Sequence, residues 1–332
     1  MVDWEHLTPL AEGAVRHWLG KSPEALVRVE GGTLNWNFRV VTGGRDFALR
    51  CHRDNLESER ILGEHALLAW VAARGIAVPV AIPSRSGRTL VEADGHRWSF
   101  ALWLPGAHVP RGILSSAQAW ALGETHGRIQ THLATHPDSL DAGLTLHWDI
   151  DESKRTLGRL IGVASERGEE PWIVEALARQ RDLLGAMTPL TPEDITTLPR
   201  QLVHGDFHDQ QVLFEGDEVC AVLDWEIWRT DPRAWELVRS LSFSKVMDSP
   251  RLEDYLRGYH EHIRLGEDEA RLALRLWFQS RIAGTWAWSA CFVEGNDRVR
   301  DFFPDMVAEL DRITTAGWTE GIADRLVRAA CN

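Results

Sequence analysis

The fold is decided by residues 202–225, which read LVHGDFHDQQVLFEGDEVCAVLDW. Two short apolar runs, 212–214 and 219–223, lie on either side of a polar turn that contains Gly216. Apolar runs separated by a short glycine-containing turn are typical of a β-hairpin, so we expect two antiparallel strands here.

Strand pairing in this hairpin brings distant polar residues together. If Phe214 pairs with Val219, then Gln211 lies opposite Val222. Asp224 projects from the same open end of the hairpin, close enough for the Gln211 amide and the Asp224 carboxylate to reach one ion. The sequence therefore predicts a small polar site at this end.

Asp206 enters just upstream of that end and adds a second carboxylate. Oxygen atoms from two carboxylates and an amide suit a hard cation such as magnesium. A single His-x-Asp or Asp-Trp pair is more often an ordinary loop or strand end, and that structural interpretation is the alternative. The full set, spread over two predicted strands, favours a site for a metal-bound phosphate.

Composition limits the class of protein. At 332 residues the chain exceeds the size that one hydrophobic core usually serves, so two lobes are expected. Its formal net charge of −13 argues against a general binder of nucleic acid or anionic membranes, because both need a basic surface. The charge is compatible with a cationic substrate without requiring one.

Cysteine spacing, hydropathy and the N-terminal residues indicate the cellular compartment. The four cysteines are far apart and lack zinc-site spacing, which fits a reducing environment. No stretch has the length of an apolar membrane span, and residues 1–6 lack the basic start of a signal peptide. We therefore expect a cytoplasmic protein with no membrane partner.

A longer pattern extends the central stretch. Its members, in chain order, are His204, Asp206, His208, Gln211, Asp224, Trp225, Asp231 and Pro232. This pattern resembles the aminoglycoside phosphotransferase, choline kinase and homoserine kinase superfamily. The resemblance implies an α+β, bilobal protein-kinase-like fold, with an N-terminal antiparallel-sheet lobe over 1–104. A larger, mainly helical lobe over 105–332 would carry the catalytic and metal-binding hairpin.

The resemblance also implies roles for these residues. Asp206 stands at the position of the catalytic base, and Asp224, eighteen residues later, at that of an aspartate that bridges magnesium ions. The position five residues after the base is usually an asparagine that binds magnesium, whereas this chain has Gln211. Glutamine offers the same carbonyl oxygen on a stem one methylene longer. His204 and His208 are implied to brace the catalytic loop.

Gly31, Gly32 and Thr33 lie in a loop between two predicted strands. Glycines allow backbone amides to approach phosphate oxygens, although a double glycine between strands is more often a plain turn. The form Gly32-x-x-Asn35-x-Asn37 is similar to the nucleotide loop of homoserine kinase-like proteins and occurs where that loop should be. The resemblance thus implies that these residues bind nucleotide phosphates.

Two further pairs complete the implied nucleotide site. Arg50 stands where the superfamily often has a lysine that holds phosphates, and Glu64 stands where a helix-borne glutamate pairs with it. We predict an Arg50–Glu64 ion pair, with solvent-facing side chains as the alternative. The backbone of Ala101 and Trp103 lies in the implied hinge that binds adenine.

Helix signals and tryptophans give further predictions. Thr8 is expected to cap a helix over 8–19, and Asp231 to cap a helix that starts at Pro232. Among the sixteen tryptophans, Trp277 and Trp288 share one face of a predicted helical stretch, 270–292. Such a stripe is usually core packing, and the alternative is an aromatic wall or ammonium cage for a substrate.

Two functions remain open. The first is an ATP- and Mg²⁺-dependent kinase that transfers the γ-phosphate to a hydroxyl of a small acceptor, for which amine-bearing molecules are candidates. The second is a non-catalytic nucleotide or metabolite binder of the same fold, motivated by Arg50 and Gln211 at phosphate and metal positions. Residue types do not identify the acceptor.

Overall fold

The computed structural model describes most of the chain, namely residues 4–29, 35–138, 149–315 and 317–331. The predicted nucleotide-loop residues Gly31, Gly32 and Thr33 lie outside the described residues. An antiparallel sheet near the N-terminus and a mainly helical remainder confirm the predicted α+β class.

Backbone contacts divide the chain into two compact units. The first comprises Met1–Leu114 with Asp209–Trp228, and the second comprises Ser115–His208 with Arg229–Asn332. The hairpin that follows Asp209 thus groups with the N-terminal sheet, whereas the sequence places it in the C-terminal lobe. The lobe boundary at 104 stays a prediction.

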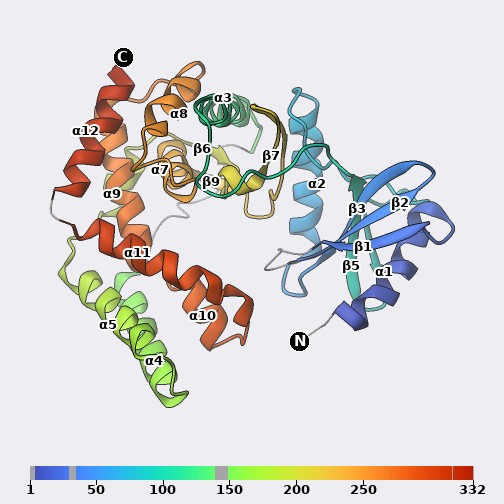
Figure 1. The fold of residues 1–332 in the computed structure, drawn as a ribbon, viewed down its shortest axis with the longest axis horizontal. Coiled ribbons are helices and arrows are strands. Elements are labelled where there is room, and N and C mark those ends of the chain that lie inside the picture. The colour runs from blue at the N-terminus through green and yellow to red at the C-terminus, as the bar shows by residue number, and fades with distance from the viewer. Residues whose placement is uncertain (1–3, 30–34, 139–148, 316, 332) are drawn as a thin grey trace. The chain divides into compact units, whose positions relative to one another are not determined.

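The first unit is built on a five-stranded sheet (Figure 1). Neighbouring strands are antiparallel and follow the order β1-β2-β3-β5-β4. The elements of this unit are α1 (Trp4–Leu19), β1 (Ala25–Val29), β2 (Trp36–Thr42), β3 (Arg45–His52), α2 (Ser58–Ala72), β4 (Leu90–Ala93), β5 (His96–Leu102), η1 (Asp209–Gln211), β7 (Val212–Glu215) and β8 (Glu218–Val222).

Alternation along β3 gives the sheet two different faces. Leu49 and Cys51 are buried in a core that includes the apolar face of α1. Arg50 points to the opposite face because successive side chains of a strand alternate, and there it meets Glu64 of α2. One face of the sheet is therefore hydrophobic core, and the other carries the predicted phosphate-binding cation.

The second unit is mainly helical. Its two strands form a separate antiparallel pair, β6-β9. The elements are α3 (Ser116–Leu133), α4 (Ile150–Glu166), α5 (Pro171–Ala186), α6 (Pro192–Thr196), β6 (Arg200–Val203), β9 (Arg229–Pro232), α7 (Arg233–Phe243), α8 (Arg251–His260), α9 (Glu267–Ala283), α10 (Trp286–Phe292), η2 (Asp297–Phe302), α11 (Phe303–Ile313) and α12 (Trp318–Cys331).

Glycines allow α3 and α8 to pack closely. A Cβ atom added at Gly123 would lie 1.9 Å from the carbonyl oxygen of Tyr255, and one added at Gly258 would lie 2.1 Å from that of Trp120. Larger residues cannot fit without moving a helix, because both obstacles are backbone atoms. This close approach brings His126 of α3 to the Tyr255 hydroxyl at 2.7 Å.

Two helix starts differ from the predicted ones. Helix α1 begins at Trp4, so Thr8 does not cap it and Pro9 lies inside, where its missing N–H removes one backbone hydrogen bond. Helix α7 has Pro232 at the N-cap position without a side-chain cap. Asp231 instead belongs to β9, and its buried carboxylate pairs with Arg229.

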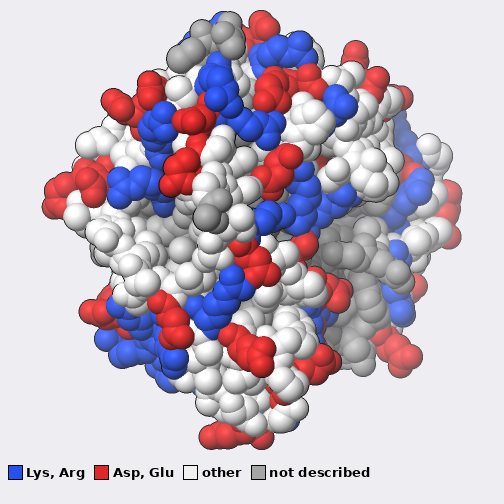
Figure 2. Space-filling model, turned by 60° about the vertical axis from the view of Figure 1, so that its left-hand side comes forward, with Lys and Arg blue, Asp and Glu red and all other residues white. Residues whose placement is uncertain are grey.

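The surface shows mixed charge. On the face of the molecule in Figure 2, acidic and basic side chains are interspersed. Among the described residues, none of the helices combines the length and the apolar character that crossing a bilayer requires.

Candidate active site

The β7–β8 hairpin carries the two predicted metal ligands, and a bulge sets its geometry. Phe214 pairs with Val219 as predicted, but Leu213 pairs with Ala221. Cys220 is therefore an extra residue in β8. Such a bulge shifts the register beyond it by one position.

This shift corrects the expected position of Gln211. Val222 lies opposite Val212. The prediction that Val222 lies opposite Gln211 is therefore wrong. Gln211 instead accepts a hydrogen bond from the Leu223 amide through its backbone carbonyl, at 2.7 Å. It comes one residue closer to Asp224 than the regular register would allow.

Asp224 has an unusual backbone conformation. Its φ angle is +57°, in the left-handed region that residues other than glycine rarely adopt, although Asp tolerates it better than most. The Gln211 amide nitrogen donates to the Asp224 Oδ2 atom at 3.4 Å. The two predicted metal ligands are thus in contact at the open end of the hairpin.

Arg50 lies between two carboxylates of the same unit. Its guanidinium is 3.5 Å from Glu64 and 4.0 Å from Asp224, so the predicted Arg50–Glu64 ion pair is present. Burial raises the pKa of Glu64 to about 7, and the charge of Arg50 opposes that rise. Burial alone would lower the pKa of Arg50, but the neighbouring carboxylates raise it, so the guanidinium stays charged.

The donor atoms fit a magnesium ion that also binds phosphate. The Asp224 side chain is 42% exposed, and rotating the Gln211 amide would turn its oxygen toward the same side. Within the described part of the chain, no three His, Cys, Asp or Glu side chains gather as a metal site. Magnesium commonly takes one or two protein oxygens and completes its shell with phosphates and water, so this set is sufficient.

The predicted adenine hinge covers the end of β5 and the residue that follows it. Ala101 is buried, pairs with Ala48 of β3 and forms an isolated bridge with Ala81. The Trp103 amide donates to the carbonyl of Asp46 at 3.1 Å. These bonds fix the backbone of the segment, and its contact with adenine stays a prediction.

Asp206 belongs to the second unit, where cationic and imidazole groups surround it. Its Oδ1 atom forms an ion pair with Arg239 of α7 and lies 3.7 Å from His208 Nε2. Burial by itself would raise the pKa of Asp206. The charges of Arg239, His208 and His204, with the hydrogen bond from Arg239, nevertheless lower that pKa below its ordinary value. The carboxylate is therefore ionised at neutral pH, with a 20% exposed side chain.

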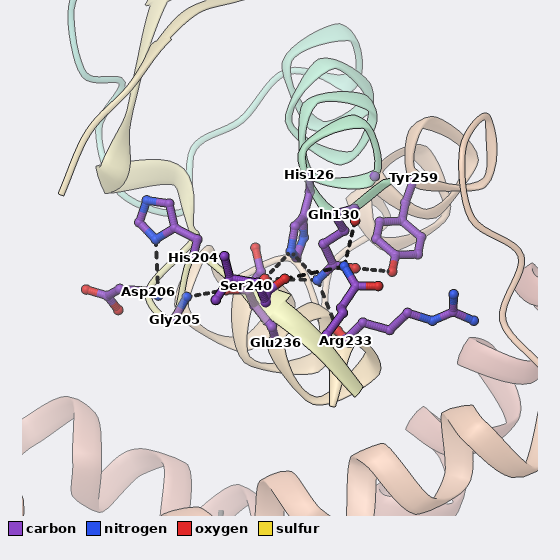
Figure 3. A network of polar contacts seen from close by, with 12 residues as sticks. His126, Gln130, His204, Gly205, Asp206, Arg233, Glu236, Ser240 and Tyr259 are labelled. Carbon is purple, nitrogen blue, oxygen red and sulfur yellow. Dashed lines mark hydrogen bonds and ion pairs between the residues drawn. The ribbon is translucent and has the colours of Figure 1, made fainter. Parts of the chain in front are cut away.

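A buried polar network holds the loop that carries Asp206 (Figure 3). Gly205, with φ at +89°, donates its amide to the Glu236 carboxylate, which also contacts His126 at 3.2 Å. Burial would raise the pKa of Glu236, but the His126 hydrogen bond and nearby charges lower it to about 2. The Asp206 amide donates to His204 Nδ1 at 3.2 Å. These contacts support the predicted structural role of His204.

His208 and Arg239 share an aromatic support. The His208 ring stacks on Phe243, with 5.4 Å between the ring centroids. The Arg239 guanidinium lies 4.3 Å from the centroid of the same ring. Stacking limits the movement of both groups beside Asp206, which agrees with a bracing role for His208.

Three residues near these sites were not predicted from the sequence. Arg239 follows Glu236 by three positions, so helical spacing places both on one face of α7, and this is the signal that points to it. Arg60 and Glu226 contact residues far away in the chain. Nothing in the local pattern distinguishes them from surface charges.

The tryptophan stripe is core packing for the most part. Gly284 separates α9 from α10, so Trp277 and Trp288 lie in different helices, and both are buried. Trp288 packs against Phe303, with 4.0 Å between ring centroids. The interpretation as core packing is confirmed for these two, whereas Trp286 is 54% exposed.

The chain is similar to known phosphotransferases over most of its length. The model of the phosphotransferase enzyme family matches residues 25–276. The homoserine kinase of Zymomonas mobilis subsp. mobilis is 26% identical over 273 residues, which cover 79% of this chain and 81% of that protein.

Solved structures show the same fold. A microcompartment-associated aminopropanol kinase has a TM-score of 0.62 at 18% identity, covering 96% of this chain and 99% of its own. An amicoumacin kinase in complex with AMP-PNP, Ca²⁺ and amicoumacin has a TM-score of 0.58 at 15% identity, covering 98% and 94%. Because the family model matches well over half of the residues, the chain belongs to the phosphotransferase enzyme family, and the prediction of a kinase is confirmed.

Proposed function

We propose that this protein is an ATP- and Mg²⁺-dependent kinase that phosphorylates a hydroxyl group of a small, amine-bearing acceptor. Family membership supports phosphoryl transfer. The names of its relatives, homoserine kinase and aminopropanol kinase, denote kinases of small amino alcohols, which supports the acceptor class. AMP-PNP in the amicoumacin kinase supports ATP as the donor.

The first unit would bind the nucleotide. The Arg50 guanidinium would contact phosphate oxygens, because Glu64 and Asp224 keep it charged and restrict its position. Gly31, Gly32 and Thr33 would add backbone amides, and the backbone of Ala101 and Trp103 would contact adenine. An arginine can bind phosphate through two parallel hydrogen bonds, whereas a lysine acts as a point charge.

Gln211 and Asp224 would hold magnesium, as their contact and oxygen chemistry allow. When bound, the ion neutralises charge on the phosphates and on the transferring group. The chain's own contribution is to keep the Asp224 carboxylate at the open end of the hairpin, where the bulge at Cys220 brings Gln211 beside it.

Asp206 would orient the acceptor hydroxyl and take its proton. Phosphoryl transfer passes through a loose transition state, so the base needs correct placement more than high basicity. Asp206 meets this need because Arg239 keeps it ionised and because Glu236 holds the backbone of the neighbouring Gly205. Positioning of this kind can supply much of the rate enhancement.

The observation that carries the proposal is the Asp206 carboxylate, which is ionised, paired with Arg239 and still partly exposed. The test is ADP formation with Mg²⁺-ATP across a panel of acceptors: homoserine, 1-amino-2-propanol, choline and spectinomycin. We expect turnover with at least one amine-bearing acceptor. The variant Asp206→Asn should lose turnover by about a hundredfold or more while it still binds AMP-PNP.

Two results would contradict the proposal. Turnover that is unchanged in Asp206→Asn would remove Asp206 from the mechanism. Binding of Mg²⁺-AMP-PNP by the wild-type protein, without turnover of any acceptor, would favour the non-catalytic binder.

A further inference from the structure

Glu226 is a buried carboxylate two residues beyond Asp224. Its side chain is only 3% exposed. A buried charge needs partners, because removing it from water without compensation costs several kcal/mol. The identity of these partners indicates what the residue does.

Two side chains at the ends of sheet strands contact the two oxygen atoms of Glu226. The Asn35 amide nitrogen donates to Oε2 at 2.5 Å, and the Arg53 guanidinium lies 2.6 Å from Oε1. Asn35 also accepts a hydrogen bond from the Arg53 backbone amide through its Oδ1 atom, at 3.1 Å. The three residues therefore form a closed polar cluster, the Asn35–Arg53–Glu226 cluster.

The members of this cluster come from three segments of the proposed nucleotide site. Asn35 immediately precedes β2 and follows the loop of Gly31 to Thr33 in the chain. Arg53 follows β3 directly, three residues beyond Arg50. Since Glu226 is two residues from Asp224, the cluster connects the start of β2, the end of β3 and the metal-ligand segment within one compact unit.

Helix α2 also contacts the segment that contains Glu226. The Arg60 guanidinium donates to the backbone carbonyl of Glu226 at 3.0 Å and to that of Trp228. It also lies 4.1 Å from the Trp228 ring centroid. Gly63, one turn later on α2, leaves room for this ring, because an added Cβ would approach it to 3.2 Å.

A carboxylate two residues after a metal-binding aspartate could instead be a further metal ligand. The contacts argue against that role. Both oxygens of Glu226 face nitrogen groups of Asn35 and Arg53, so a cation at Glu226 would have to displace the Arg53 guanidinium.

We infer that Glu226 is a positioning residue that fastens the Asn35 end of the nucleotide loop to the segment carrying Asp224. The inference rests on the proposed nucleotide site. It predicts that Asn35 and the segment of Asp224 are held at a fixed separation before nucleotide binds. Loss of the cluster should therefore weaken nucleotide binding while the metal ligands stay intact.

The test uses three variants of the full chain: Glu226→Gln, Asn35→Asp and the exchanged pair Asn35→Asp/Glu226→Gln. Asn35→Asp places two carboxylates against each other, and the exchanged pair restores one amide against one carboxylate. We expect each single variant to raise the dissociation constant for AMP-PNP, at saturating Mg²⁺, by about tenfold. The exchanged pair should recover most of that loss.

Hydrogen exchange of the protein without nucleotide provides a second readout. The Arg53 amide donates to Asn35, so faster exchange around residues 35–37 and 53 is expected in both single variants. Protection should return in the exchanged pair. The matched control is Glu169→Gln, which breaks the Arg300–Glu169 ion pair of the second unit and should leave AMP-PNP binding unchanged.

The outcomes separate the inference from the proposed function. If the wild-type protein binds no Mg²⁺-AMP-PNP, the proposed nucleotide site is wrong. If it binds but the single variants bind equally well, or the exchanged pair recovers nothing, the positioning role is wrong. A higher Mg²⁺ requirement in Glu226→Gln, with no effect of Asn35→Asp, would identify Glu226 as a metal ligand and overturn the inference. Hydrogen exchange confirms that each variant is folded.

Discussion

Arg239 of α7 forms an ion pair with Asp206, the proposed base, across 33 residues of sequence. Two consequences follow. The charge of Arg239 keeps the partly buried carboxylate ionised, and the stacking of the guanidinium on Phe243 fixes the direction from which it binds. Arg239 thus contributes both to the ionised state of Asp206 and to its position.

Replacing Arg239 with glutamine should therefore shift the pH profile. A lowered pKa means that Asp206 loses its proton at a lower pH than an ordinary aspartate, so activity persists into the acidic range. In Arg239→Gln the acidic limb of kcat/KM should move to higher pH by about one unit. His208 and His204 also face Asp206 and limit the shift. The measurement is kcat/KM for the acceptor from about pH 3 to about pH 7, a range that includes the acidic limb of an aspartate.

The control for this prediction is Arg325→Gln. Arg325 pairs with Glu253 at 3.1 Å between α12 and α8, and its loss should leave the limb in place. An acidic limb that is identical in Arg239→Gln and the wild type would show that Arg239 does not set the protonation of Asp206.

The Arg50–Glu64 pair predicts a pH-dependent stability. Burial raises the pKa of Glu64 from 4.5 to about 7, so the folded state holds this proton more tightly than the unfolded state. The contribution to stability is fully present below about pH 4.5 and is lost as pH rises through about 7. Glu64→Gln removes this dependence. The quantity to compare is the free energy of unfolding of Glu64→Gln minus that of the wild type. This difference should increase by up to about 3 kcal/mol from about pH 5 to about pH 8, because only the wild type loses stability over that range.

Urea unfolding of both proteins at the two pH values measures this difference. Glu169→Gln is a suitable reference, because a hydrogen bond from Arg300 lowers the pKa of Glu169 and so leaves no titration between those values. A Glu64→Gln difference that is flat with pH would mean that Glu64 is already ionised at pH 5.

The hairpin illustrates what sequence patterns can and cannot specify. Two apolar runs and Gly216 predict both strands and the Phe214–Val219 pair correctly. The bulge at Cys220 was not predictable, because a small apolar residue fits either a regular strand or a bulge. Since one extra residue moves every later side chain, the position of Gln211 was wrong although the hairpin was right.

Long-range contacts explain the other differences. Asp231 followed by Pro232 is a reasonable helix start, yet Asp231 pairs with Gln201 of β6 and therefore belongs to a strand. Tertiary pairing outweighs a local cap signal. The face on which Arg50 lies was predictable because strand alternation is a local rule, whereas its pairing with Glu64 was implied by the resemblance to the superfamily. Asp206 and the metal pair belong to different compact units, and their convergence stays a prediction.

The length of the Gln211 side chain should matter. Its amide reaches Asp224 Oδ2 at 3.4 Å, already a long hydrogen bond. Gln211→Asn introduces the residue common in the superfamily, but it withdraws the amide by about 1.5 Å. We expect the Mg²⁺ concentration for half-maximal activity to rise several-fold in Gln211→Asn and further in Gln211→Ala, with KM for the acceptor unchanged. A Gln211→Asn variant that needs less Mg²⁺ than wild type would show that the bulge does not set this distance.

Asp224 adopts an unfavourable backbone conformation and also has a proposed metal-binding role. Substitution by glycine relieves the first and removes the second, so the two effects can be measured separately. Its φ of +57° is easy for glycine, so Asp224→Gly should raise the free energy of unfolding without ligand by about 1 kcal/mol. It should also abolish Mg²⁺-dependent AMP-PNP binding, because the carboxylate is lost. Asp94, with φ of +52° in the β4–β5 turn, is the matched control. Asp94→Gly should give a similar gain in stability with unchanged nucleotide binding. If Asp224→Gly still binds Mg²⁺-AMP-PNP as tightly as Asp94→Gly, then Asp224 is not a metal ligand, and its conformation needs another explanation.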